Sequence, residues 1–163
     1  MTDLMSENLA NAIHEQIGHE KYNSHLYLYI CGYLRNKGLN GLAKHFEEQH
    51  EEEFKHSKMF FDLLTDLNTD VKIPEIDAID IIFNNVLDIG KTYLDREVLT
   101  TTSINEIKKM SIDEDNPVVE EFMRKIIVLQ QNEYSEATDW NDKAELTAGD
   151  WKAVFMWNMA LEG

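Results

Sequence analysis

The chain has 163 residues, of which 43% are hydrophobic, and a formal net charge of −16; its length fits one domain with a sizeable core. So acidic a protein is unsuited to a nucleic-acid partner or an anionic membrane surface and attracts cations instead. The single cysteine, Cys31, excludes an intramolecular disulfide and a zinc or iron centre built from cysteines.

The first predicted element is a long helix over about residues 6–36. The residues ahead of it lack the basic start and apolar run of a signal peptide, and no stretch has the roughly 20 apolar residues of a membrane span, so we expect a cytoplasmic protein. Ser6 is a favourable N-cap. Apolar residues then recur at helical spacing, at Leu9, Ile13, Ile17, Tyr27, Cys31 and Leu34. Gly38 and Gly41 predict a short turn into an antiparallel second helix over about 41–67.

The segment 68–77 contains Pro74 and shows no helical pattern, so we predict an extended crossover. Ten extended residues reach roughly 33 Å, which is nearly the length of a long helix, so the second and third helices run parallel. The third helix is predicted over about 79–110, with Phe83 on its inner face. The fourth covers about 117–146 and begins at Pro117, a residue suited to a first helical turn.

A short terminal helix is predicted from Trp151 to about Leu161, after a break at residues 147–149. It is apolar nearly all round, so a face that is not packed on the bundle needs another surface to cover it. Self-assembly into a homo-oligomer follows as an expectation. The whole chain, 1–163, is thus predicted to be one all-α domain: a four-helix bundle over about 6–146 with up-down-down-up order, and a fifth helix over about 150–161.

A carboxylate and an imidazole interrupt the apolar stripe of the second helix in the motif Glu53-x-x-His56. Residues three apart share one helix face. Burying an unpaired carboxylate costs several kcal/mol, so this pair predicts a bound cation.

The same spacing recurs. Glu20 lies 33 residues before Glu53, and Glu97 lies 33 residues before Gln130, which is followed by Glu133. A lone glutamate and an i, i+3 pair from each half of a bundle form the ligand set of di-iron carboxylate proteins. Oxygen-rich ligation with one imidazole suits Fe(II) and then Fe(III), and Glu53 and Glu97 could each bridge two ions.

Over nearly its whole length the chain resembles the bacterial non-haem ferritins. The matching stretches are residues 14–24, Glu52-Glu53-x-x-His56, residues 61–66, Glu97 with residues 104–107, and Gln130-x-x-Glu133. The resemblance implies a ferritin-like fold and a ferroxidase that oxidises Fe(II) with O2 or H2O2. It also implies a hollow 24-subunit cage that stores ferric oxyhydroxide, with the terminal helix lining the four-fold axes.

The resemblance further implies the roles of the site residues. Glu20, Glu53 and His56 would form the first iron site; Glu53, Glu97 and Glu133 would form the second, with Gln130 beside it and Tyr27 next to the centre. Haem-binding relatives carry Glu-x-x-His in both halves and a haem-ligating Met where this chain has Phe54, so we expect no haem. A third iron site of many bacterial ferritins would need glutamates at positions 52, 129 and 132; only Glu52 is retained beside Leu129 and Asn132, and we predict that this site is absent or weakened.

Three other functions are compatible with a bundle of this kind. A rubrerythrin-type di-iron peroxidase is disfavoured by the missing Cys-x-x-Cys centre, and a DNA-protecting miniferritin builds its sites between subunits. A non-catalytic acidic scaffold would bind no metal. We expect the remaining histidines to be surface or hydrogen-bonded residues, namely His14, His19, His25, His45 and His50, and a run of acids to form a solvated face, namely Glu47, Glu48, Glu51 and Glu52.

Overall fold

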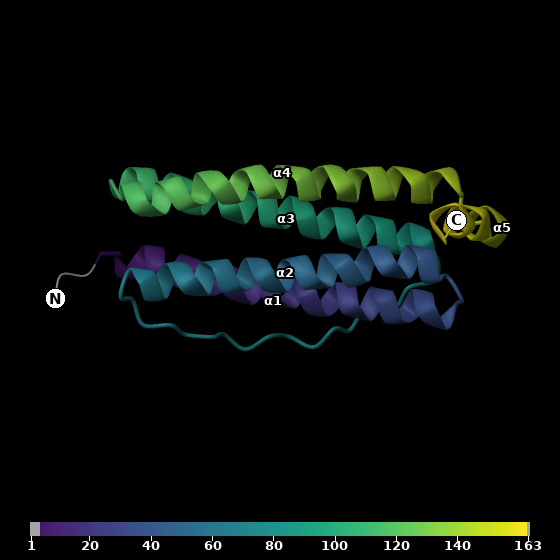
Figure 1. Cartoon of the computed structure of the whole chain (residues 1–163), viewed down its shortest axis with the longest axis horizontal. Coiled ribbons are helices and arrows are strands. Elements are labelled where there is room, and N and C mark those ends of the chain that lie inside the picture. The colour runs from purple at the N-terminus through teal and green to yellow at the C-terminus, as the bar shows by residue number, and fades with distance from the viewer. Residues whose placement is uncertain (1–3, 163) are drawn as a thin grey trace.

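The computed structural model describes residues 4–162. Four long helices packed side by side form the body of the protein (Figure 1). The helices are α1 (Glu7–Asn36), α2 (Asn40–Asp66), α3 (Val86–Asp113), α4 (Pro117–Leu146) and the short α5 (Trp151–Glu162). Helices α1 and α4 run in one direction and α2 and α3 in the other (Figure 1). The predicted all-α bundle with up-down-down-up order and a short fifth helix is confirmed; the domain ends predicted at residues 1–3 and 163 lie outside the described residues.

None of the helices within residues 4–162 combines the length and the apolar character needed to cross a bilayer.

The helix ends follow signals that are local in the sequence. The Ser6 side chain accepts a hydrogen bond from the backbone N–H of Leu9 at 3.0 Å, which caps α1. At the other end Gly38 has a φ of +77°, a conformation that glycine adopts without strain. The Leu39 N–H then donates to the Leu34 carbonyl at 3.0 Å, the six-to-one bond of a Schellman ending. The turn is tight, so α2 folds back along α1.

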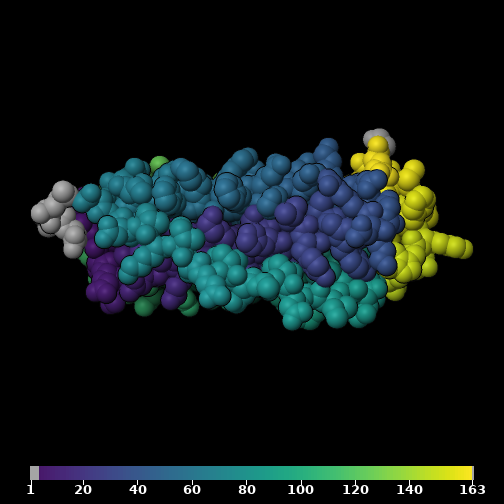
Figure 2. All heavy atoms as spheres, turned by 90° about the horizontal axis from the view of Figure 1, so that it is seen from below, coloured from purple at the N-terminus to yellow at the C-terminus, as the bar shows by residue number. Residues whose placement is uncertain are grey.

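The crossover is longer than predicted, because the third helix begins at Val86 and not near residue 79. Residues 79–85 alternate between buried or half-buried and exposed positions, which is the period of extended chain. Asn85 then caps α3 by accepting a hydrogen bond from the Leu87 N–H at 2.8 Å. Phe83 is buried as expected, but it packs from the crossover against α1 through the rings of Tyr29 and Tyr33. The crossover lies along the outside of the bundle (Figure 2).

A belt of buried polar side chains divides the apolar core into two clusters. One cluster surrounds Tyr27, Phe46 and Trp140, and the other surrounds Ile17, Phe60 and Met123. Between them each helix contributes buried polar residues, namely Glu20 and Asn23 from α1, Gln49, Glu53 and His56 from α2, Glu97 and Thr100 from α3, and Gln130 and Glu133 from α4. The two clusters hold these polar groups at mid-height, away from both ends of the bundle.

Helix α5 lies across the end of the bundle (Figure 1). Val154 is buried in the core, and the Trp157 ring lies 4.9 Å from that of Trp140. Asn158 is fully buried, and its side-chain oxygen accepts a hydrogen bond from the Leu42 N–H at 3.0 Å. The opposite side of α5 exposes large apolar residues, namely Phe155, Met156, Met159 and Leu161.

Candidate metal centre

The polar belt contains the six residues that the sequence analysis assigned to the two-iron centre, namely Glu20, Glu53, His56, Glu97, Gln130 and Glu133. Glu20, Glu53 and Glu97 are at most 1% exposed, and His56, Gln130 and Glu133 are also buried. Four helices supply them, so the tertiary fold assembles the site. Their role as ligands stays a prediction; their convergence is a property of the structure.

Two groups of these side chains are close enough to hold metal ions. Glu20, Glu53 and His56 offer ligand atoms that lie within 4.8 Å of one another, and so do Glu53, Glu97 and Glu133. Glu53 belongs to both groups. A carboxylate shared in this way can bridge two ions, as two-metal sites require.

Four carboxylate oxygens in the centre have no hydrogen-bond partner although they are buried. They are Glu20 Oε2, Glu133 Oε2 and both oxygens of Glu53. Buried polar atoms almost always have a partner, and an uncompensated buried charge is strongly destabilising. Cations bound among these oxygens would remove that cost, which is the chemical argument for a metal site here.

His56 faces the same space through its Nδ1 atom. That nitrogen lies 3.3 Å from Glu133 Oε1 on α4 and 3.9 Å from Glu53 Oε2 on its own helix. A neutral imidazole nitrogen is a good ligand for iron or zinc. The position of His56 therefore suits a role as the one nitrogen ligand in an oxygen-rich set.

Both oxygens of Glu97 are held by hydrogen-bond donors from other helices. The Tyr27 hydroxyl donates to Oε1 at 2.5 Å, and the Gln130 side-chain amide donates to Oε2 at 2.7 Å. Such donors fix the orientation of a ligand carboxylate. In this structure Gln130 thus acts on Glu97, and its own binding of a metal stays a prediction.

Burial and crowding of like charges shift the acidities of the centre. Burial, followed by the charge of Glu20, raises the pKa of Glu53 well above its usual range. Burial and the charge of Glu97 raise the pKa of Glu133 to about 10. The pKa of Glu97 is raised by burial, while the hydrogen bonds from Tyr27 and Gln130 oppose that shift. Without a metal the centre therefore retains protons at neutral pH, and metal binding has to displace them.

The phenol of Tyr27 remains protonated under all ordinary conditions. Its full burial, and then the charge of Glu97, raise its pKa well above the usual value. It therefore acts toward Glu97 as a hydrogen-bond donor and not as a phenolate.

The sequence analysis missed one residue that contacts the centre directly. Gln16 is buried one turn before Glu20 on α1, and its amide donates to Glu20 Oε1 at 2.8 Å. Ser103 on α3 in turn donates a hydrogen bond to Gln16. The signal available in the sequence was a polar residue at i−4 from a buried glutamate, on the same helix face.

The remaining histidines are outside both ligand groups, as predicted. His14, His19, His45 and His50 each have a hydrogen-bond partner, and His25 is exposed. Glu52 is also outside both groups, and its carboxylate lies 3.1 Å from Lys55 Nζ. The predicted weakening of a third iron site at Glu52 stays a prediction.

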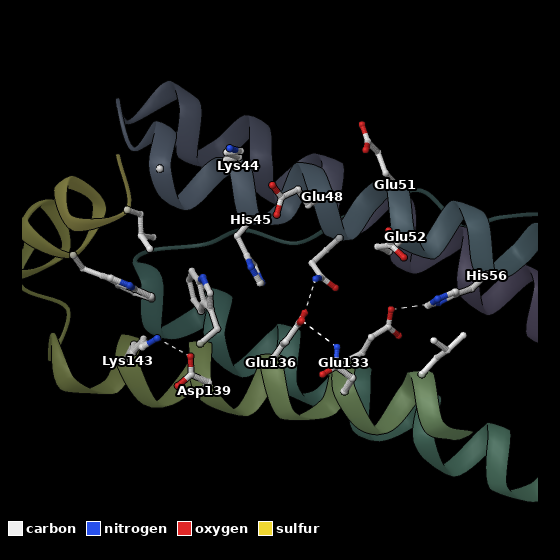
Figure 3. A pocket seen from close by; sticks show the side chains of 17 residues that line it. Lys44, His45, Glu48, Glu51, Glu52, His56, Glu133, Glu136, Asp139 and Lys143 are labelled. Atoms are coloured by element: carbon white, nitrogen blue, oxygen red, sulfur yellow. Dashed lines mark hydrogen bonds and ion pairs between the residues drawn. The ribbon is translucent and has the colours of Figure 1, made fainter. Parts of the chain in front are cut away.

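A groove connects the centre to the surface between α2 and α4 (Figure 3). It has a volume of about 740 Å³, and its lining includes His56 and Glu133 at the inner end. Several carboxylates line it, so a cation can approach the centre along an acidic path.

Comparison with known proteins shows which family the sequence matches. The profile of the ferritin-like domain matches residues 10–147. A probable bacterial non-haem ferritin-like protein of Haemophilus influenzae is 25% identical over 153 residues, covering 94% of this chain and 93% of that protein. The bacterial non-haem ferritin of Bacteroides fragilis is 26% identical over 147 residues, or 90% and 92% of the two chains. Ferritin BfrB of Mycolicibacterium smegmatis is 32% identical over 126 residues, or 77% and 70%.

A solved structure gives the same result for the fold. The open-pore ferritin of the hyperthermophilic archaeon Archaeoglobus fulgidus superposes with a TM-score of 0.92 at 25% sequence identity, covering 98% of each chain. The similarity thus extends over the four long helices, the crossover and the terminal helix.

Proposed function

Because this chain belongs to the ferritin family, we propose that it oxidises Fe(II) at the centre in the polar belt and stores the ferric product inside an oligomeric cage. The observation that carries the proposal is the set of buried carboxylate oxygens without hydrogen-bond partners, on Glu20, Glu53 and Glu133. Iron is the substrate in this reaction. The protein supplies its ligands and its environment.

Charge balance supports two iron ions at a time. Four carboxylates meet in the centre, from Glu20, Glu53, Glu97 and Glu133, and together they carry four negative charges when ionised. Two Fe(II) ions neutralise them. We propose that the first ion binds to Glu20, Glu53 and His56, the second to Glu53, Glu97 and Glu133, and that Glu53 bridges the two.

The oxidation step balances with two iron ions at one centre. Each Fe(II) would give one electron, and the two electrons with two protons from water would reduce O2 to H2O2, or H2O2 to two molecules of water. The oxygen-rich ligand set suits the Fe(III) that forms. The apolar clusters on either side keep bulk water from the centre except along the groove, and a low local dielectric strengthens electrostatic interactions there. Tyr27 and Gln130 hold Glu97 in place while the charge changes.

Assembly into a cage is supported by the exposed apolar side of α5. Phe155 and Met159 are 54% and 50% exposed and lie four residues apart, on one helix face. By family resemblance we propose a cytoplasmic 24-subunit cage in which each chain, 1–163, acts as one domain without haem. The acidic composition favours collection of Fe(II).

The test is an anaerobic titration of the metal-free protein with Fe(II), followed by addition of O2. We expect rapid oxidation that saturates near two Fe(II) per chain, and a soluble ferric product. Glu20→Ala should bind one Fe(II) fewer and oxidise iron at least about tenfold more slowly, since a ligand is lost. Glu15→Ala is the matched control, because Glu15 is an exposed glutamate on the same helix.

Other outcomes would identify other functions. Oxidation with H2O2 that is much faster than with O2, in a small oligomer, would indicate a peroxidase of the rubrerythrin type. Iron oxidation at the rate of buffer, in all three proteins and without stoichiometric binding, would indicate a non-catalytic scaffold.

A further inference from the structure

The groove between α2 and α4 is strongly acidic beyond the centre itself. Six of its lining residues are carboxylates and two are lysines, namely Glu48, Glu51, Glu52, Glu133, Glu136 and Asp139 against Lys44 and Lys143. Asp139 pairs with Lys143 at 2.7 Å. Within residues 4–162 no lysine, arginine or histidine forms an ion pair with Glu136.

Gln49 is the feature that distinguishes this groove from an ordinary acidic surface. It belongs to α2, is only 6% exposed, and points across the groove at α4, where its amide nitrogen donates to Glu136 Oε2 at 2.8 Å. Its amide oxygen is buried and has no hydrogen-bond partner. A buried polar atom without a partner in the protein needs one from outside it, either a water molecule or an ion.

Gln49 and Glu136 face each other across the groove, next to the contact between His56 and Glu133. Gln49 precedes His56 by two helical turns on α2, and Glu136 follows Glu133 by about one turn on the antiparallel α4. Figure 3 shows Glu136 and Glu133 side by side on α4, both directed at α2. Glu136 is thus the groove carboxylate next to Glu133 on α4, and it is more exposed than Glu133.

The second oxygen of Glu136 is also oriented by an amide. Asn132 Nδ2 donates to Glu136 Oε1 at 3.3 Å. Amide groups present an oxygen in place of a nitrogen after a half-turn about the last side-chain torsion. The pair of Gln49 and Glu136 can thus offer a carbonyl oxygen and a carboxylate to one ion, and such hard oxygen donors suit divalent cations that retain part of their water shell.

We propose that Gln49 and Glu136 form a third divalent-cation site, outside the two ligand groups of the centre. Fe(II) binds there transiently before it moves to His56 and Glu133. The role in iron supply rests on the proposed function, whereas the site itself binds any hard divalent cation. Its two ligands lie outside positions 52, 129 and 132, and Asn132 acts only by orienting Glu136. The site is therefore distinct from the third iron site expected by family resemblance.

Binding is tested with Mn2+ on the assembled, metal-free protein, counting bound ions by the loss of the electron paramagnetic resonance signal of free Mn2+. We expect three bound ions per chain in the wild type and two in Glu136→Gln and Gln49→Leu. Both substitutions keep side-chain size, and Glu136 is only half-buried, so the fold is retained. Asp139→Asn is the matched control, because it removes the same charge from the same groove and should leave three ions bound.

Iron supply is tested by the Fe(II) concentration that gives half-maximal oxidation. Glu136→Gln should raise it about tenfold, the effect of losing one oriented ligand, and Asp139→Asn should change it by less than about twofold. Two bound Mn2+ ions in the wild type would overturn the proposal. An equal loss of bound Mn2+ in Glu136→Gln and Asp139→Asn would also overturn the proposal. The cations would then be attracted by the overall negative charge of the groove and not bound at one site.

The same two measurements separate the cation site from the proposed ferroxidase function. If the wild type oxidises no iron yet binds a Mn2+ ion that Glu136→Gln alone removes, the cation site stands and the ferroxidase proposal falls.

Discussion

Tyr27 and Glu97 are joined across α1 and α3 by a hydrogen bond of 2.5 Å, although they are 70 residues apart in the chain. A bond to an ionised carboxylate is among the stronger hydrogen bonds in proteins. Glu97 also accepts from Gln130 on its other oxygen. Its position is therefore fixed from two sides before any iron binds.

Loss of the Tyr27 hydroxyl should slow iron oxidation without abolishing it. In Tyr27→Phe we expect two Fe(II) per chain to bind, and the initial oxidation rate to fall about 10- to 100-fold, as is usual when a group that orients a ligand is removed. Tyr93→Phe is the control, since its ring lies 5.2 Å from that of Tyr27 while its hydroxyl is hydrogen-bonded to His45 at 3.2 Å. Equal rates in the two variants would show that Glu97 does not depend on Tyr27.

The stability of the metal-free protein should fall as pH rises. The pKa of Glu133 is about 10 in the folded protein and 4.5 ordinarily, so between these values the folded state binds more protons than the unfolded state. Stability then decreases with pH across this window, by up to about 1.4 kcal/mol per pH unit for each such group. Thermal unfolding from pH 5 to 9 measures the slope.

Two comparisons give this pH prediction its controls. Glu133→Gln should make the slope shallower, whereas Glu15→Gln, at an exposed position of α1, should leave it unchanged. Saturation with Fe(II) under anaerobic conditions should reverse the trend, because cations bind only the ionised carboxylates. A pH-independent stability without metal would contradict the proposed protonation of the centre.

The long helices could be predicted from sequence because their ends depend on nearby residues. Ser6, Gly38 and Pro117 act within one turn of the ends they set. The start of α3 could not be predicted in this way. Residues 79–85 are held extended by contacts far along the chain, such as those of Phe83 with Tyr29 on α1.

The convergence of the centre was predictable because the fold repeats a simple geometry. In an antiparallel helix pair, residues equally distant from the connecting turn face each other. A separation of 33 centred on the turn therefore places Glu20 opposite Glu53 and Glu97 opposite Gln130. The buried amide of Gln49 was not predictable as a partner of Glu136. A glutamine on a long helix carries no local sign of whether the helix across the bundle will bury it.

Asn158 provides a cap for a helix that has none of its own. The residue before α2, Leu39, makes no side-chain capping bond, and Asn158 on α5 accepts from the Leu42 N–H instead. Asn158→Ala should lower the free energy of unfolding by about 1 kcal/mol, the usual value of a helix cap. Urea denaturation measures this loss. Lys152→Ala, at an exposed polar position of the same helix, should change it by less than about 0.5 kcal/mol; equal losses would mean that the cap contributes nothing.

The exposed apolar side of α5 should decide assembly and not the folding of the single chain. Phe155 and Met159 project away from the bundle, whereas Val154 and Asn158 pack on it. The double variant Phe155→Ser with Met159→Ser should therefore keep its helical content and its stoichiometric Fe(II) binding, because it leaves the core and the centre intact. We expect light scattering to show particles much smaller than the wild-type assembly, and oxidised iron to precipitate because no closed cavity holds it. Lys152→Ser alters the same helix at an exposed polar position and should assemble normally. A double variant of wild-type particle size would show that α5 does not form the contacts that close the assembly.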